Sequence, residues 1–199
     1  MTPRDERELL MRRLAETAGK LSCRPEQPPG ERVPAPLGEA DRIALFGKTL
    51  AEAGGLLFRG PEESVLHDLA ESLRTEGVTS LFFPEGDETA RRVAEALVPF
   101  GPFLLATCAD VLGGDPAVTA GFRTAEAGIA ETGTVVETGA EGRTLLPGLL
   151  ADVHVSLLPA ASLYDRMDGA LAVLCADPPR NITLSSGPCG TRKAIVLLL

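Results

Sequence analysis

Residues 78–106 read VTSLFFPEGDETARRVAEALVPFGPFLLA, and this stretch decides the fold class. Two short apolar runs, 78–83 and 103–106, flank a segment with helical spacing. Asp87 is placed to cap that helix, which we expect to run to about Val98. A strand, a helix and a second strand in this order are typical of two parallel strands in one sheet. The stretch therefore predicts a parallel sheet with at least one covering helix.

The same alternation extends outward from this stretch in both directions. We expect further helices at 39–53, 61–77 and 162–175, and further strands at 56–58, 133–137, 153–158, 182–185 and 195–199. Strands alternating with helices predict an α/β fold, a mainly parallel sheet with helices on both faces. Ligands in such open sheets bind at the carboxyl ends of the strands, so the loops that follow the strands are candidate sites.

Composition narrows the class of protein. The 199 residues include 19 Lys and Arg against 28 Asp and Glu, which gives a net charge of −9. An acidic balance argues against general nucleic-acid binding, which needs a basic face. No apolar run reaches the roughly 18 residues of a membrane span, and the charged N-terminus lacks a signal-peptide core. We therefore expect a cytoplasmic protein without a membrane span.

The first 38 residues differ from the rest of the chain. Residues 4–18 have weak helical spacing, and five prolines fall within residues 23–38. Prolines at this density forbid a helix and indicate an extended linker. We therefore expect an N-terminal helical arm with a Pro-rich linker at 1–38 and one α/β domain at 39–199. The arm either docks on a partner or a second copy, or is a partly mobile tail.

Metal and nucleotide sites have few candidate residues. The four cysteines show no CxxC spacing, and only two histidines are present, so we expect no metal site and no cofactor. No GxGxxG or GxxxxGK[ST] run occurs, which argues against nucleotide binding through such loops. Cys189 has no adjacent histidine in the sequence and is a poor candidate for a thiol nucleophile.

The run AEAGIAETGTVVET at 125–138 is the first candidate site. Glu126 and Glu131 could do acid–base work if burial shifts their pKa values, and Glu131 is the candidate catalytic residue. Thr132, Gly133 and Thr134 could approach a ligand closely. The alternatives are a tight turn with solvated acids, or Glu131 as the anchor of a helix or turn.

The run SSGPCGT at 185–191 is the second candidate site. Its hydroxyl and backbone N–H groups could form a cradle for a small carboxylate or another anion. The candidate ligand-binding residues here are Ser186, Gly187, Gly190 and Thr191. Between the two runs, DVHVSL at 152–157 alternates polar and apolar residues, so His154 lies either at a pocket or at a solvent-facing edge.

The runs GIAETGTVVETG, ADVHVSLLPA and ITLSSGPCGT, in this order, resemble the LUD-domain family and, within it, the lactate utilization C group. The resemblance covers roughly residues 39–199. It implies a NagB/RpiA/CoA-transferase-like α/β fold. It also implies a part in oxidising L-lactate to pyruvate beside two iron–sulfur proteins, which would hold the clusters that this chain lacks.

The sequence departs from the family pattern at two places. Cys189 stands where the family has Ser, and a thiol is a weaker hydrogen-bond partner than a hydroxyl. After Thr191 the chain passes directly to Arg192, without an acidic and His-containing segment that family members carry. That segment is either deleted from this chain or is a loop omitted from its numbering, and an intact mass of 20.8 kDa would support deletion.

Three functions are compatible with these observations. The first is an accessory subunit of a lactate-oxidising complex with iron–sulfur partner proteins. The second is an independent small-molecule enzyme of the CoA-transferase-like fold. The third is a diverged, non-catalytic binding module, which a genuine deletion after Thr191 would favour.

Overall fold

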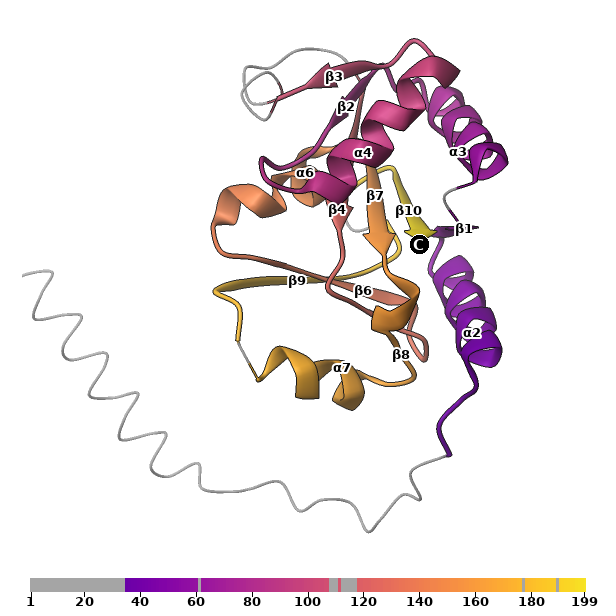
Figure 1. Cartoon of the computed structure of the whole chain (residues 1–199), viewed down its shortest axis with the longest axis vertical. Coiled ribbons are helices and arrows are strands. Elements are labelled where there is room, and N and C mark those ends of the chain that lie inside the picture. Colours follow the sequence, from indigo (N-terminus) through magenta and orange to yellow (C-terminus); the bar gives the residue numbers. More distant parts are fainter. Residues whose placement is uncertain (1–34, 61, 108–110, 112–117, 177, 189) are drawn as a thin grey trace, which may run out of the picture. The chain divides into compact units, whose positions relative to one another are not determined.

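The computed structural model describes residues 35–60, 62–107, 111, 118–176, 178–188 and 190–199 (Figure 1). The chain divides into two compact units, Met1–Pro36 and Leu37–Leu199, and the helices and strands given below belong to the second. The helix expected at 4–18, most of the proline-rich linker and Cys189 lie outside the described residues. The boundary predicted at residue 38 stays a prediction.

A six-stranded sheet forms the centre of the second unit. Its strand order is β1-β10-β7-β4-β2-β3, and every neighbouring pair is parallel. The strands are β1 Leu56–Arg59, β2 Ser80–Phe82, β3 Leu104–Ala106, β4 Thr119–Thr124, β7 Val153–Leu158 and β10 Lys193–Leu198. The strands of the 78–106 stretch pair as neighbours, with Ser80 opposite Leu104. The predicted α/β class with a mainly parallel sheet is therefore confirmed.

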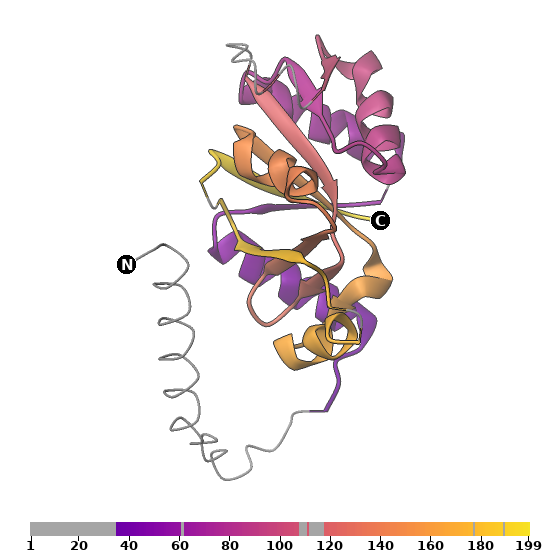
Figure 2. The ribbon, with the colours of Figure 1, turned by 90° about the vertical axis from the view of Figure 1, so that its left-hand side faces the viewer.

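Helices cover both faces of this sheet. They are α2 Glu39–Glu52, α3 Glu63–Thr75, α4 Glu88–Leu97 and α6 Leu146–Leu150, whereas α7 Met167–Leu174 packs on the smaller sheet described below. Successive side chains of β10 divide the core, because Ile195 and Leu197 pack with α3 and α4, whereas Val196 and Leu198 pack with α2. Figure 2 shows α3 and α4 in the upper part of the ribbon, with α2 and α7 in the lower part.

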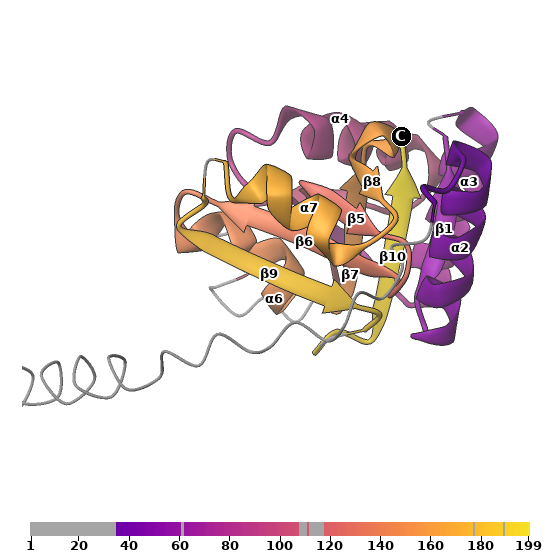
Figure 3. The same cartoon turned by 90° about the horizontal axis from the view of Figure 1, so that it is seen from below.

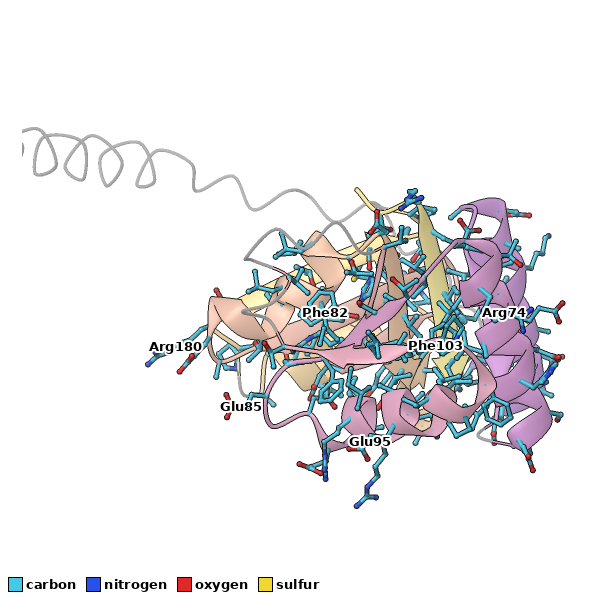
Figure 4. All side chains as sticks on the ribbon, turned by 90° about the horizontal axis from the view of Figure 1, so that it is seen from above. Arg74, Phe82, Glu85, Glu95, Phe103 and Arg180 are labelled. Atoms are coloured by element: carbon cyan, nitrogen blue, oxygen red, sulfur yellow. The ribbon has the colours of Figure 1, made fainter. Side chains whose placement is uncertain are left out.

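The helices start and pack as their sequences predict. The Asp87 carboxylate accepts a hydrogen bond of 3.0 Å from the backbone N–H of Ala90, so it caps α4. Phe82 of β2 is fully buried. In Figure 4 it lies inside the packed layers, while Arg74 and Glu95 point outward. Burial of apolar side chains such as Phe82 contributes about 1.5–3 kcal/mol each.

A second, smaller sheet has the order β8-β5-β6-β9 (Figure 3). Its strands are β5 Ala127–Ile129, β6 Thr134–Gly139, β8 Leu163–Tyr164 and β9 Asn181–Ser186. β6 pairs antiparallel with both β5 and β9, while β5 and β8 are parallel. Strands were predicted at 133–137 and 182–185, which correspond to β6 and β9. β5 and β8 were not predicted, since three residues at 127–129 and two at 163–164 are too short to show alternation. The helix expected at 162–175 therefore begins only at Met167.

Residues 187–192 join β9 to β10. The backbone N–H of Arg192 donates to the carbonyl of Asp152 at 2.7 Å, and the two side chains form an ion pair, also at 2.7 Å. A short connection is thus held against the start of β7. The sequence is continuous here, which favours a deletion over an omitted loop.

Candidate functional site

Three buried polar side chains meet between the two sheets. They are Glu137 of β6, with 2% of its surface exposed, and His154 and Ser156 of β7, with 6% and 3% exposed. Along β7, Val153 and Val155 pack with α3 and α4, so His154 and Ser156 lie on the opposite face of the sheet. α6 packs on that face and β6 supplies Glu137, which explains why every residue of β7 is buried.

The three side chains form a compact hydrogen-bonded set around one oxygen. Nε2 of His154 lies 2.8 Å from Oε1 of Glu137, and the Ser156 hydroxyl donates to the same oxygen at 2.8 Å. Oγ of Ser156 and Nε2 of His154 are 3.3 Å apart. Oε1 of Glu137 is therefore a shared acceptor that fixes the other two side chains.

Arg123 of β4 balances the charge of Glu137. Its guanidinium is 7% exposed, with Nε 3.8 Å from Oε2 of Glu137, and its Nη1 donates to the carbonyl of Thr144. Among the described residues, buried Nε has no hydrogen-bond partner. The carboxylate and guanidinium are thus buried together, which avoids an isolated charge in the interior.

The geometry differs from that of a nucleophilic serine triad. In a triad the imidazole takes the proton of the serine hydroxyl. Here the Ser156 hydroxyl donates to Glu137, and Nε2 of His154 is directed to the same oxygen. An ionised carboxylate only accepts, so in a hydrogen bond with this oxygen Nε2 is the donor. Ser156 positions the carboxylate, and the Glu137–His154 pair is left for acid–base or hydrogen-bonding work.

A cavity of 170 Å³ opens beside this set. It is lined by Glu137, Leu145, Gly148, Leu149, His154, Thr183, Leu184 and Ser185. Three leucines make part of the wall apolar, the charged or titratable groups are Glu137 and His154, and Thr183 and Ser185 add hydroxyls. This combination is typical of sites for small molecules.

Gly148 of α6 keeps the space beside the pair open. A Cβ at this position would lie 3.0 Å from both Cε1 and Nε2 of His154 and 3.1 Å from Oε2 of Glu137. These distances are tighter than ordinary contacts, so a side chain here would press on both groups. The absence of a side chain at residue 148 therefore gives access to the pair.

A larger cavity of 440 Å³ lies where β1 and β10 end and α2 and α3 begin. Its charged lining residues, Glu39, Arg59 and Glu62, are exposed to solvent. No buried hydrogen-bonded set of described side chains lines it, so the smaller cavity is the better candidate site.

Glu131 lies away from both cavities, at the start of α7. Its Oε1 accepts a hydrogen bond of 3.0 Å from the backbone N–H of Met167, and Nε of Arg166 is 4.0 Å from Oε2. A carboxylate at a helix N-terminus satisfies a free N–H and interacts favourably with the helix dipole. This geometry favours the anchor among the roles considered for Glu131.

The predicted hydroxyl residues form a row beside Glu131. Oγ1 of Thr134 lies 2.7 Å from Oγ1 of Thr132 and 2.6 Å from Oγ of Ser186. Thr134 is buried, while Thr132 and Ser186 are exposed. The hydroxyls thus satisfy one another, and none of the three lines either cavity described above.

Two of the predicted glycines pack against the protein itself. Gly133 has φ +64°, and a Cβ there would lie 2.4 Å from the backbone nitrogen of Leu50. Gly187 has φ +73°, and its Cβ would lie 2.1 Å from the carbonyl oxygen of Ala53. Both glycines therefore permit close approach to the end of α2, where the sequence suggested approach to a ligand.

The remaining predicted residues are dispersed. Glu126 is exposed, and its backbone N–H donates to Val136 at 2.9 Å. Gly190 has φ +83° with nothing within 4 Å of a Cβ, and the Thr191 hydroxyl donates to the carbonyl of Lys193 at 3.3 Å. The structure therefore joins Thr132, Thr134 and Ser186 by hydrogen bonds and packs the adjacent Gly133 and Gly187 against the end of α2, whereas Glu126, Gly190 and Thr191 lie apart.

Sequence reasoning missed Glu137 and Arg123 and left His154 and Ser156 undecided. The available signal was a lone acid after the apolar pair Val135-Val136, in a strand expected to be buried. Charged residues are rarely fully buried unless they are paired, so such an acid indicates a buried partner.

Among solved structures, the chain is similar to the crystal structure of a DUF162 family protein from Deinococcus radiodurans, determined at 1.70 Å resolution. The TM-score is 0.59 at 15% identity, and the match covers 82% of this chain and 99% of that chain. No protein-family model and no curated protein sequence matches. The likeness therefore establishes a shared fold.

The described residues contain neither a cluster of metal-binding side chains nor a membrane-spanning helix. No group of three or more His, Cys, Asp or Glu side chains in that part of the chain could hold a metal ion. None of the helices described is long and apolar enough to cross a membrane.

Proposed function

We propose that this chain is an accessory subunit in the cytoplasmic oxidation of L-lactate to pyruvate, acting beside iron–sulfur partner proteins. The 170 Å³ cavity would be its small-molecule site. The likeness to a DUF162 protein, which is a LUD-domain fold, supports the family part of the proposal. The lactate part rests on the three sequence runs that resemble the lactate utilization C group.

One observation carries the proposal: the three runs converge on this cavity. Glu137 belongs to the first run, His154 to the second, and Thr183, Leu184 and Ser185 to the third. These runs lie far apart in the sequence, and only the pairing of β6 with β9 and the contact of β6 with β7 bring them together. A purely structural resemblance would not require the three runs to share one cavity.

In the proposed site each buried side chain has a distinct task. Glu137 and His154 would contact the ligand, since both line the cavity. Ser156 would act as a positioning residue through its hydrogen bond to Glu137. Arg123 would hold the charge of Glu137 in the interior, because Nε lies 3.8 Å from Oε2.

The test is L-lactate-dependent dye reduction in extracts with and without the chain, with all partner proteins present. We expect activity to be lost on removal and restored by adding back the purified protein. Add-back of Gly148→Ala should restore little, because its Cβ crowds Glu137 and His154. Gly142→Ala is the matched control, since a Cβ there meets nothing within 4 Å. Unchanged activity without the chain would remove the lactate role.

A second candidate is an independent small-molecule enzyme, favoured by the buried Glu137–His154 pair. Paired, desolvated titratable groups beside a cavity are a frequent mark of acid–base catalysis. Turnover of a small molecule by the purified chain alone would favour this candidate. A diverged binding module is the third candidate, favoured by the short connection at residues 187–192, and it predicts binding without turnover.

A further inference from the structure

The two oxygens of the Glu137 carboxylate are in different situations. Oε1 accepts from the Ser156 hydroxyl and lies 2.8 Å from Nε2 of His154. Oε2 accepts no hydrogen bond from any described residue, and the nearest cation, Nε of Arg123, is 3.8 Å away. Oε2 therefore has no donor within the described part of the protein, whereas Oε1 has two polar neighbours.

This oxygen borders the cavity. A Cβ at Gly148 would come within 3.1 Å of Oε2, and both Gly148 and Glu137 line the cavity. Arg123 is not among the lining residues, and its Nε is fully enclosed, so a ligand cannot take its N–H as a donor. A ligand in the cavity therefore meets Oε2 of Glu137, an acceptor to which a donor group of the ligand can bind.

The other lining residues do not change the preference for a ligand that donates a hydrogen bond. Leu145, Leu149 and Leu184 are apolar and contact any ligand in the same way. The hydroxyls of Thr183 and Ser185 can both donate and accept, so they serve an alcohol and a carbonyl alike. His154 is the remaining polar side chain of the lining, and its Nε2 is directed to Oε1 of Glu137. Oε2 of Glu137 is therefore the group that separates ligands that donate from ligands that accept.

We propose that the cavity beside Glu137 selects the alcohol form of a short ligand over its ketone form. The hydroxyl of the ligand donates to Oε2 of Glu137, and the ketone form offers no proton there. This inference names the ligand class of the proposed site and so rests on the proposed function. No bond is made or broken, because the preference concerns binding alone.

The charge of Glu137 also sets the orientation of the ligand. Glu137 lines the cavity and its partner Arg123 does not, so a carboxylate on the ligand meets the negative group of the pair first and is repelled by it, and the hydroxyl end enters first. An uncharged amide of the same ligand lacks this repulsion. The site should therefore bind a 2-hydroxy amide more tightly than the corresponding 2-hydroxy acid.

The test uses two alcohol–ketone pairs and the full chain. L-lactate and pyruvate form the charged pair, and lactamide and pyruvamide form the uncharged pair. Binding is followed through the imidazole nitrogen shifts of His154 by NMR. The chain has only two histidines, so His67→Gln, at an exposed helix position, identifies the His154 signals.

We expect each alcohol to bind about 10-fold or more tightly than its ketone, the effect of one unmade hydrogen bond to a buried acceptor. Lactamide should also bind more tightly than L-lactate. Gly148→Ala should weaken all four probes, while Gly142→Ala should leave them unchanged. Glu137→Gln, whose amide can donate, should bring each pair close to equal affinity. If this variant does not fold, the wild-type preference in both pairs still decides.

Three results would overturn the inference: equal affinities within both pairs, tighter binding of the ketones, or no shift of His154 with any probe. Dye reduction and binding together separate failure of this inference from failure of the proposed function. An alcohol preference without any effect of the chain on dye reduction removes the lactate role and keeps the ligand class. Dye reduction that needs the chain, with no preference in binding, keeps the role and removes the inference.

Discussion

The two faces of β6 carry polar residues that behave differently. On one face, Thr134 joins Thr132 and Ser186 in a row of hydroxyls that satisfy one another. On the other, Glu137 has one oxygen occupied by Ser156 and His154 and one oxygen bordering a cavity. A polar residue can serve a ligand only where its hydrogen-bonding capacity is not already used by the protein. By this criterion the Glu137 face is the better candidate for a functional site.

The largest effect should come from Glu137→Ala, because it leaves the Arg123 guanidinium buried without its counter-charge. We expect a loss of about 3–5 kcal/mol in the free energy of unfolding, measured by urea denaturation. The double variant Arg123→Met with Glu137→Leu should recover most of this loss. A single variant within about 1 kcal/mol of wild type would show that the pair is not buried as described.

A smaller effect should follow from Gly133→Ala, on the loop that leads into the hydroxyl face. The new Cβ would lie 2.4 Å from the backbone of Leu50 at φ +64°, so both strain and a clash oppose it. We expect a loss of about 2–3 kcal/mol by the same measurement. Gly142→Ala should stay within about 0.5 kcal/mol, which separates the packing of Gly133 from a general glycine effect.

Glu131→Gln tests whether the hydroxyl face carries chemistry. If Glu131 anchors α7 through the Met167 N–H, the change should cost about 0.3–1 kcal/mol of stability. Dye reduction in the reconstituted extract should then be unchanged. A loss of activity at unchanged stability would instead move the functional site to this face and contradict the comparison of the two faces.

The smallest expected effect is on the free energy of unfolding at low pH, and it concerns Asp165 on the side of the hydroxyl face. The backbone N–H of Leu37, aided by Arg42 and opposed by partial burial, holds the pKa of Asp165 below its ordinary value of 3.8. A lowered pKa stabilises the fold above the unfolded value, and this contribution is lost as the pH falls through the folded value.

We therefore expect Asp165→Asn to be less stable than wild type at about pH 6, with the difference shrinking toward about pH 3. Urea midpoints at the two pH values measure this. A difference that grows on acidification would contradict the assignment of the interaction to Asp165.

The main sheet could be predicted because its strands and helices are long enough to show their periods. The run 153–158 was predicted with its observed bounds, and Asp87 was recognised as a cap. In the small sheet β6 and β9 were predicted, but β5 and β8 were missed, because these two are defined by pairing with distant residues and not by local pattern. Tertiary pairing overrode the helical spacing of residues 163–164.

The candidate site was predictable only in part, for a related reason. The sequence named Thr132, Thr134 and Ser186 as candidate ligand-binding residues, but it could not show that their hydroxyls satisfy each other. The partner of Glu137 lies on another strand of another sheet, so no local pattern connects it with His154. The alternation DVHVS indicated a polar face, and burial of that face depends on α6 and β6.

The position of β10 between β1 and β7 has a consequence for synthesis on the ribosome. Leu56 pairs with Ile195, so β1 has no neighbour among the described strands until residues 193–198 have left the exit tunnel. During synthesis β1 therefore stays unpaired until the last strand has been made. A nascent chain that stops before residue 193 cannot form the complete six-stranded sheet. Partly made copies should be the ones that chaperones bind and proteases remove.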